Sequence, residues 1–131
     1  MNLLTKRTKT LGDIGENLVV NYLQNNGYTI LAKNFRYSRF AEIDIIAEIN
    51  DTIIFIEVKT RRNKKFGMPA EAVTIQKQQK IFIAATKFIQ DNKLFDKPCR
   101  FDVVEVFASN KDQIIGYKIN HIQNAFEVSN Y

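Results

Sequence analysis

The sequence predicts a single α/β domain in which a mixed sheet is flanked by two helices. A helical pattern over residues 11–26 is followed by three strand patterns, and a longer helical pattern over residues 70–91 is followed by further strands. This order differs from the strict alternation of a doubly wound fold. Residues 40–61 indicate an antiparallel hairpin, which we place at the centre of the sheet. A chain of 131 residues can bury a sizeable core as one domain.

The composition suits a polyanion as partner. The chain carries 19 basic and 14 acidic residues, a formal charge of +5. Cys99 is the single cysteine, so no internal disulfide can form, and a reducing compartment fits. There is no run of 18 apolar residues and no signal peptide, so we expect a cytoplasmic protein without membrane contact. We expect residues 1–10 to form a basic N-terminal arm and residues 11–131 to form the domain.

The first helix is expected over residues 11–26, with Gly27 as its stop. On a helical wheel Glu16 lies in the middle of the apolar face, where a carboxylate must be paired, protonated or bound to a cation. Alternatively, Glu16 lies in the first turn near solvent, where the helix dipole favours it. The helix alone leaves both interpretations open. Gly12 and Gly15 flank Glu16, and their cost of about 1 kcal/mol each in a helix suggests a close backbone approach.

A strand over residues 28–38 precedes the hairpin, whose turn is Asn50-Asp51, because both residue types tolerate a left-handed backbone. Side chains alternate between the two faces of a strand, so each strand of the hairpin has one apolar core face. The residues of that face are Ala41, Ile43, Ile45, Ala47 and Ile49 on one strand and Ile54, Ile56 and Val58 on the other.

The same register places Asp44 opposite Glu57 and Glu42 opposite Lys59 on the second face. Carboxylates held together on a half-buried face need a proton or a cation between them. Mg²⁺ takes oxygen ligands and leaves room for water and phosphate, so the pair suits magnesium. Lys59 points to the same side as Glu57 and is placed to hold a phosphate or an attacking water. The plainer alternative is an amphipathic ribbon with its acidic face in solvent.

Residues 60–69 are expected to form a basic loop that follows the second hairpin strand. The loop is either merely solvated or lies along a phosphodiester backbone, and the same alternatives apply to Lys77 and Lys80 on the second helix. We expect that helix, over residues 70–91, to bury a stripe of apolar side chains. The basic side chains of the loop are Arg61, Arg62, Lys64 and Lys65, and the stripe is Ala72, Ile75, Phe82 and Ile89, joined by Ile83 and Ala85.

The C-terminal part is expected to hold a strand over residues 99–108, another over 113–119 and a short final segment over 121–127. His121 is the only histidine, so a zinc site is not expected. No histidine-based triad and no phosphate-cradling glycine loop is present. The phenylalanine and isoleucine residues are assigned to the core, with no stacking platform for nucleic-acid bases.

A glutamate in the first helix, an aspartate on one strand and Glu-x-Lys on the next resemble the constellation of the PD-(D/E)xK nucleases. The resemblance is closest to the archaeal Holliday-junction resolvases and to the uncharacterised YraN-like family, and it extends from about Leu11 to Phe126. Ile43 stands where the nuclease motif has proline. The stretches that carry the resemblance are GDIGENLVVNYLQNNGYTIL, NFRYSRFAEIDIIAE, IIFIEVKTR, FGMPAEAVTIQKQQKI, CRFDVV and HIQNAF.

The resemblance implies a restriction-endonuclease-like αβββαβ core and metal-dependent hydrolysis of DNA phosphodiesters. Asp44 and Glu57 would be metal ligands for Mg²⁺, with Mn²⁺ as a substitute, and the carbonyl of Val58 would complete the set. Glu16 would lie nearby as a further catalytic residue, and Lys59 would orient or deprotonate the attacking water. The residues implied to contact nucleic acid are Arg61, Arg62, Lys64, Lys65, Lys77 and Lys80.

The sequence therefore leads to the hypothesis of a metal-dependent endonuclease whose preference is for DNA shape, such as a branched junction, over base sequence. The alternative is a nucleic-acid-binding module that keeps the fold without cutting. A protein-interaction domain would leave the inward Glu16 and the Asp44–Glu57 pair unexplained. Resolvases with this core act as dimers, so the resemblance also points to a homodimer, although no stretch of the sequence marks an interface.

Overall fold

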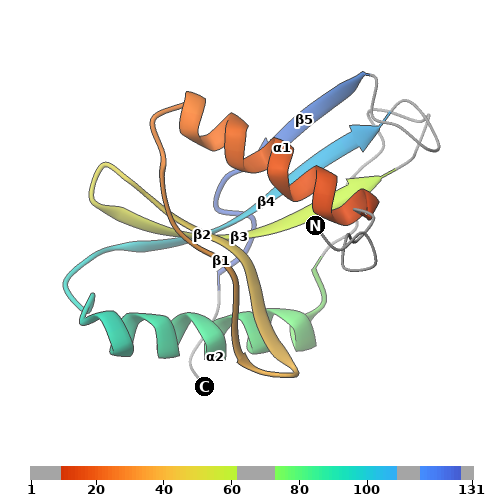
Figure 1. Ribbon diagram of the computed structural model, residues 1–131. Coiled ribbons are helices and arrows are strands. Elements are labelled where there is room, and N and C mark those ends of the chain that lie inside the picture. Colours follow the sequence, from red (N-terminus) through yellow and green to blue (C-terminus); the bar gives the residue numbers. More distant parts are fainter. Residues whose placement is uncertain (1–9, 62–72, 109–115, 128–131) are drawn as a thin grey trace, which may run out of the picture.

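The computed structural model describes residues 10–61, 73–108 and 116–127. Among these residues the chain forms one mixed sheet with a helix on each side (Figure 1). The strand order is β1-β2-β3-β4-β5, and every neighbouring pair is antiparallel except the parallel pair β3–β4. The elements in chain order are α1 (Leu11–Asn25), β1 (Thr29–Ser38), β2 (Ala41–Ile49), β3 (Thr52–Arg61), α2 (Ile75–Asn92), β4 (Cys99–Ala108) and β5 (Tyr117–Ile122).

This architecture confirms the predicted fold class and is consistent with the restriction-endonuclease-like αβββαβ order, to which β5 is added. Two predicted boundaries differ. The strand expected over residues 113–119 is described from Tyr117 to Ile122, and residues 113–115 lie outside the described ranges. The segment expected over 121–127 begins inside that strand, and no helix or strand follows it up to Glu127.

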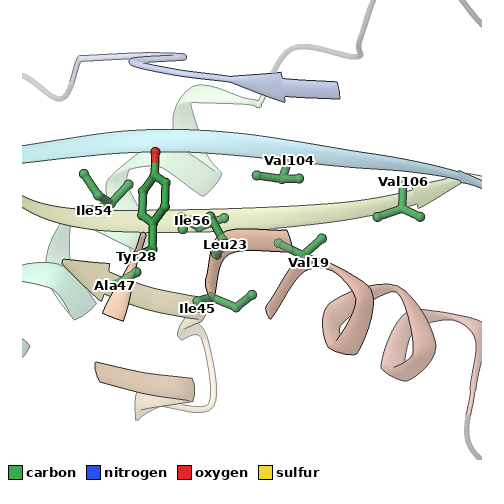
Figure 2. Packing of buried hydrophobic residues seen from close by; sticks show 9 residues of the cluster. All are labelled: Val19, Leu23, Tyr28, Ile45, Ala47, Ile54, Ile56, Val104 and Val106. Atoms are coloured by element: carbon green, nitrogen blue, oxygen red, sulfur yellow. The ribbon is translucent and has the colours of Figure 1, made fainter. Parts of the chain in front are cut away.

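Both faces of the hairpin β2–β3 are buried, which corrects the expectation of a single core face. Toward α1, Val19 and Leu23 pack against side chains of three adjacent strands (Figure 2). Toward α2, a second cluster holds Ile46 and Phe55, which the alternation had placed on the half-buried acidic face. A sheet covered by helices on both sides needs apolar residues on both faces. The strand residues of the first cluster are Ile45, Ala47, Ile54, Ile56, Val104 and Val106, and those of the second are Ala41, Ile43, Ile46, Ile53 and Phe55.

The core side of β2 changes near Asp44. Ala41 and Ile43 belong to the cluster under α2, whereas Ile45 and Ala47 belong to the cluster under α1. Strict alternation would keep these four residues on one face. The change of side therefore falls at Asp44, where the chain leaves the regular ladder with β3.

The buried stripe of α2 differs from the predicted one by a rotation of about one residue, or roughly 100°. Ile75 and Ile83 are 72% and 48% exposed, and Ala85 is the only member of the predicted stripe that is buried among the described residues. Ala72 lies outside the described residues. The apolar run from Ile81 to Ala85 covers every direction around the helix, so periodicity alone does not fix which face meets the sheet. The residues that do meet it are Ile81, Ala84, Ala85 and Phe88.

The predicted start of α2 is also corrected, because Val73 and Thr74 precede the helix. The hydroxyl of Thr74 accepts a hydrogen bond from the Lys77 N–H at 3.1 Å and caps the N-terminus. At the other end Lys93 adopts a left-handed backbone with φ 53°, which ends the helix after Asn92.

A buried polar network joins β4 to β5 and to α1. Asp102 is 1% exposed, and it receives hydrogen bonds from Arg100, from the backbone N–H of Asn124 and, at 2.7 Å, from His121 Nε2. His121 Nδ1 in turn lies 2.8 Å from the Tyr22 hydroxyl of α1. Burial opposes the charge of Asp102, but the hydrogen bonds from His121 and Arg100 outweigh it and lower its pKa. His121 therefore has a structural partner, which the sequence did not predict.

The close approach expected at the glycines of α1 exists at Gly15 and not at Gly12. A Cβ atom on Gly15 would lie 1.9 Å from Thr60 Oγ1 on β3, whereas one on Gly12 would meet Thr10 Oγ1 at 3.8 Å. Because real Cβ atoms do not approach so closely, Gly15 lets the first turns of α1 rest directly on the end of β3.

We expect Gly15→Ala to destabilise the protein by about 1–3 kcal/mol through overpacking against Thr60, although alanine favours helices. The matched change Gly12→Ala is expected to be neutral or to stabilise by up to about 1 kcal/mol. Urea unfolding would measure both variants. Adding Thr60→Ala, which removes the nearest atom, should recover part of the loss in Gly15→Ala. Equal stability of the two glycine variants would contradict the close contact.

Candidate active site at the open end of the β2–β3 hairpin

The predicted turn and register of the hairpin are confirmed. Asn50 and Asp51 have φ values of 48° and 67°, as a two-residue turn with left-handed central residues requires. The ladder pairs Ile45 with Ile56 and continues from there to the turn. It does not include the predicted pairs of Asp44 with Glu57 and of Glu42 with Lys59, because the regular pairing of the two strands stops before these residues.

A side-chain bond takes over where the ladder stops. The backbone N–H of Val58 donates to Asp44 Oδ2 at 2.8 Å. In a strand the N–H and C=O of one residue point toward the same neighbour, so the carbonyl of Val58 faces the β2 side as well. The carbonyl expected as a ligand and the carboxylate of Asp44 thus lie along the same edge of β3.

Asp44 and Glu57 lie close enough to influence each other's titration. Burial, and then the charge of Asp44, raises the pKa of Glu57 to about 7. Burial likewise raises the pKa of Asp44, although the Val58 N–H and the charge of Lys77 oppose the rise. The pair therefore takes up a proton near neutral pH unless a cation neutralises it.

This donor set fits a hard divalent cation. Two carboxylates and one backbone carbonyl are oxygen ligands, and Mg²⁺ is commonly held by one or two carboxylates while water and substrate phosphate complete its shell. Within the described ranges no three or more His, Cys, Asp and Glu side chains gather into a group that could hold a metal ion. The side-chain share of such a site would therefore be limited to the pair itself.

Lys77 supplies the nearest positive charge. Its Nζ lies 3.7 Å from Glu57 Oε1, and the side chain of Glu57 is 15% exposed. Lys77 stands in the first turn of α2, directly after the Thr74 cap. Lys59 is also near enough to lower the pKa of Glu57. Both lysines that were predicted beside the acidic pair are thus close to it.

Glu16 faces the pair from α1. Partial burial raises the pKa of Glu16, the charges of Asp44 and Asp13 raise it further, and a hydrogen bond with Asn34 opposes the rise. Of the two interpretations that the sequence left open, the inward one is favoured. Asn34 was not singled out from the sequence, although its left-handed φ of 51° within β1 suits the tolerance of asparagine for that conformation.

The predicted nucleic-acid contacts have different surroundings. Arg61 Nε lies 3.1 Å from Glu105 Oε2, and Glu105 is 1% exposed and also bonded by Asn120 at 2.9 Å. The sequence gave no sign that Glu105 would be buried with these partners. Lys80 is exposed on α2. Arg62, Lys64 and Lys65 lie outside the described residues, so their contacts stay predictions.

Both helices begin near the acidic pair. The N-terminal ends of α1 and α2 lie on the same side of the molecule as the C-terminal end of β3 (Figure 1). Gly15 against Thr60 and Lys77 beside Glu57 give the same placement. Because a helix N-terminus carries partial positive charge, this side of the molecule favours an anion such as phosphate.

The comparisons with known proteins agree with the resemblance that the motifs carry. A family model described as "Uncharacterised protein family UPF0102" matches residues 15–106, a range that includes Glu16, Asp44, Glu57 and Lys59. The chain belongs to the UPF0102 family. A UPF0102 protein of Clostridioides difficile (strain 630) is 49% identical over 118 residues, which cover 90% of this chain and 97% of that protein. A relative from Caldanaerobacter subterraneus subsp. tengcongensis is 44% identical over 118 residues, with 90% and 95% covered.

The UPF0102 match confirms the predicted family, and the names of these relatives state no activity. Among the residues that the structure describes, no helix is long and apolar enough to cross a membrane.

The raised pKa of Glu57 predicts how stability depends on pH without metal. Between the ordinary value of 4.5 and about 7, the folded protein holds a proton that the unfolded chain releases, so the free energy of unfolding falls as pH rises through this window. The loss attributed to Glu57 is about 3 kcal/mol. Urea unfolding in EDTA from pH 5 to 8 should show a clearly smaller decline for Glu57→Gln than for the wild type. Parallel pH profiles would refute the raised pKa.

Proposed function

We propose that this UPF0102 protein is a metal-dependent endonuclease that hydrolyses DNA phosphodiesters and prefers branched or otherwise structured DNA. The observation that supports the proposal most directly is the Asp44–Glu57 pair. Two carboxylates are kept together, partly buried, with the Val58 carbonyl on the same side and too little positive charge nearby to hold both fully ionised at neutral pH. A divalent cation would relieve that repulsion.

In this proposal Asp44, Glu57 and the Val58 carbonyl hold Mg²⁺, for which Mn²⁺ can substitute. The bound metal would supply Lewis-acid polarisation of the scissile phosphate and lower the pKa of a coordinated water. Water adds to phosphorus, the phosphorus–oxygen bond to the leaving nucleotide breaks, and the leaving oxygen takes up a proton. Lys59 stabilises the charge that develops on the phosphate, and Glu16 lies beside Asp44 to position water.

The surroundings favour a nucleic-acid backbone over a small anion. The N-terminal ends of two helices lie on the side of the acidic pair, and Lys77 and Lys80 project from successive turns at the start of α2. Contacts of this kind position phosphates without reading base sequence. The formal charge of +5 adds a general attraction for polyanions that weakens as salt is raised.

The second candidate is a module that binds nucleic acid without cutting it. The ion pair between Lys77 Nζ and Glu57 Oε1, at 3.7 Å, favours this candidate, because an ammonium already neutralises part of the acidic pair. The two candidates share DNA binding and differ in metal uptake. A homodimer would suit a substrate with two-fold symmetry in either case.

Substitution of both carboxylates separates the two candidates. We expect Asp44→Asn/Glu57→Gln to lose the calorimetric heat of Mg²⁺ and Mn²⁺ binding, measured with and without junction DNA. Cleavage of labelled duplex, flapped and four-way DNA should fall by roughly a thousandfold or more, because the metal contributes several kcal/mol to transition-state stabilisation. DNA binding should remain or tighten, because negative charge is removed.

The control for this experiment is Glu48→Gln. Glu48 lies on the same strand as Asp44, toward the turn, and pairs with Lys97, so its loss leaves the acidic pair in place. Cleavage that persists in the double variant would refute the assignment of the metal ligands. A wild type that binds DNA but takes up no metal, even with junction DNA present, would favour the non-cleaving module.

A further inference from the structure

The ring of Phe40 stands in solvent at the connection between β1 and β2. Its residue is 64% exposed, which corrects the assignment of all phenylalanines to the core. The connection is held locally, because the backbone N–H of Phe40 donates to Ser38 Oγ at 3.2 Å. An exposed aromatic ring on a short, hydrogen-bonded connection presents a flat apolar face without a partner in the core.

Two cations lie over this ring. Arg39 Cζ is 5.1 Å from the ring centroid, and Lys80 Nζ, which comes from α2, is 5.9 Å from it. Both distances fall within the range of a cation–π contact. Next to them, Arg36 pairs with Glu42 across the same two strands. The ring is therefore surrounded by positive charge and stays open to solvent.

This aromatic and basic surface continues into the proposed active site. Lys80 lies one helical turn after Lys77, which pairs with Glu57. Along the chain Phe40 precedes Asp44 by four residues, a span of about 13 Å in an extended strand. At about 3.4 Å per nucleotide along a duplex strand, that span corresponds to roughly four base steps.

We infer that Phe40, together with Arg39 and Lys80, is a stacking platform for an unpaired base of a DNA substrate. The inference rests on the proposed function and specifies its substrate class. Every base offers a π-face, and aromatic rings flanked by arginine and lysine bind single strands by stacking while the cations hold phosphates. A blunt duplex offers no unpaired base within its length, so the platform selects flaps, single-stranded tails and branch points close to the scissile bond.

The positive charge favours DNA over a second copy of this chain as the occupant. Within the described surface around Phe40, the side chains that touch the ring are cationic, and the acidic Glu42 is already paired with Arg36. A second copy carries the same charges and would be repelled there. Tyr37 and Ile83 extend the surface along a shallow hollow of about 220 Å³, so self-association is retained as an outcome of the test.

The test is DNA binding in EDTA, which removes cleavage from the measurement. Fluorescence anisotropy would compare a blunt duplex with the same duplex bearing an unpaired tail that contains 2-aminopurine. We expect Phe40→Leu to lose roughly ten- to a hundredfold in affinity for the tailed DNA and to keep its affinity for the blunt duplex. The quenching of 2-aminopurine on binding, which reports stacking, should disappear in Phe40→Leu.

Two further variants make the comparison specific. Phe95→Leu removes an equally exposed phenylalanine, 68% exposed, from the turn after α2 and should bind both DNAs like the wild type. Phe40→Trp keeps an aromatic face and should retain affinity and quenching. Urea unfolding of Phe40→Leu should match the wild type, since the ring lies outside both core clusters.

The outcomes separate the platform from the nuclease assignment. Unchanged tail affinity and quenching in Phe40→Leu would overturn the platform, even if the wild type cleaves DNA. A Phe40-dependent change in sedimentation without a change in DNA affinity would overturn it in favour of self-association. Selective loss of tail binding in a protein that never cleaves would support the platform and refute only the nuclease. A wild type that binds neither DNA would overturn both.

Discussion

The hairpin β2–β3 is buried on both faces, and its regular pairing ends at Ile45 and Ile56. The residues just beyond that point cannot leave the sheet, because apolar side chains on either side hold the two strands between α1 and α2. Asp44 and Glu57 must therefore stay together although their charges repel. The Val58 N–H and the Lys77 ammonium compensate in part, and burial outweighs both. The chemistry proposed for the site depends on this enforced proximity.

The two helices place the remaining groups with respect to the pair. Gly15 allows α1 to rest on Thr60, which brings Glu16 toward Asp44. The Thr74 cap fixes the first turn of α2 and so positions Lys77 beside Glu57. Each helix therefore contributes one charged side chain from near its N-terminus, where the backbone itself favours anions. Packing distances within the core thus determine the charge distribution of the site.

Local chemistry made the hairpin predictable from the sequence. Asn50 and Asp51 tolerate left-handed backbone, and the alternation on either side allows one register, so the pairing of Ile45 with Ile56 followed. The face of α2 did not follow, since the apolar run from Ile81 to Ala85 fits several rotations and only the shape of the sheet selects one. Asp102 and Glu105 lie on β4, and their partners come from segments distant in the sequence, so periodicity carried no information about them.

Cys99, the only cysteine in the sequence, opens β4 at the end of the sheet away from the acidic pair. It lies beside Ile53, whereas Glu57 lies beside Val103, four residues or about 13 Å further along the strands. The thiol is exposed, and partial burial raises its pKa, so it reacts best in mildly alkaline solution. The natural chain can therefore carry one maleimide fluorophore at a defined position without engineering, close enough to report on the hairpin and distant from its carboxylates.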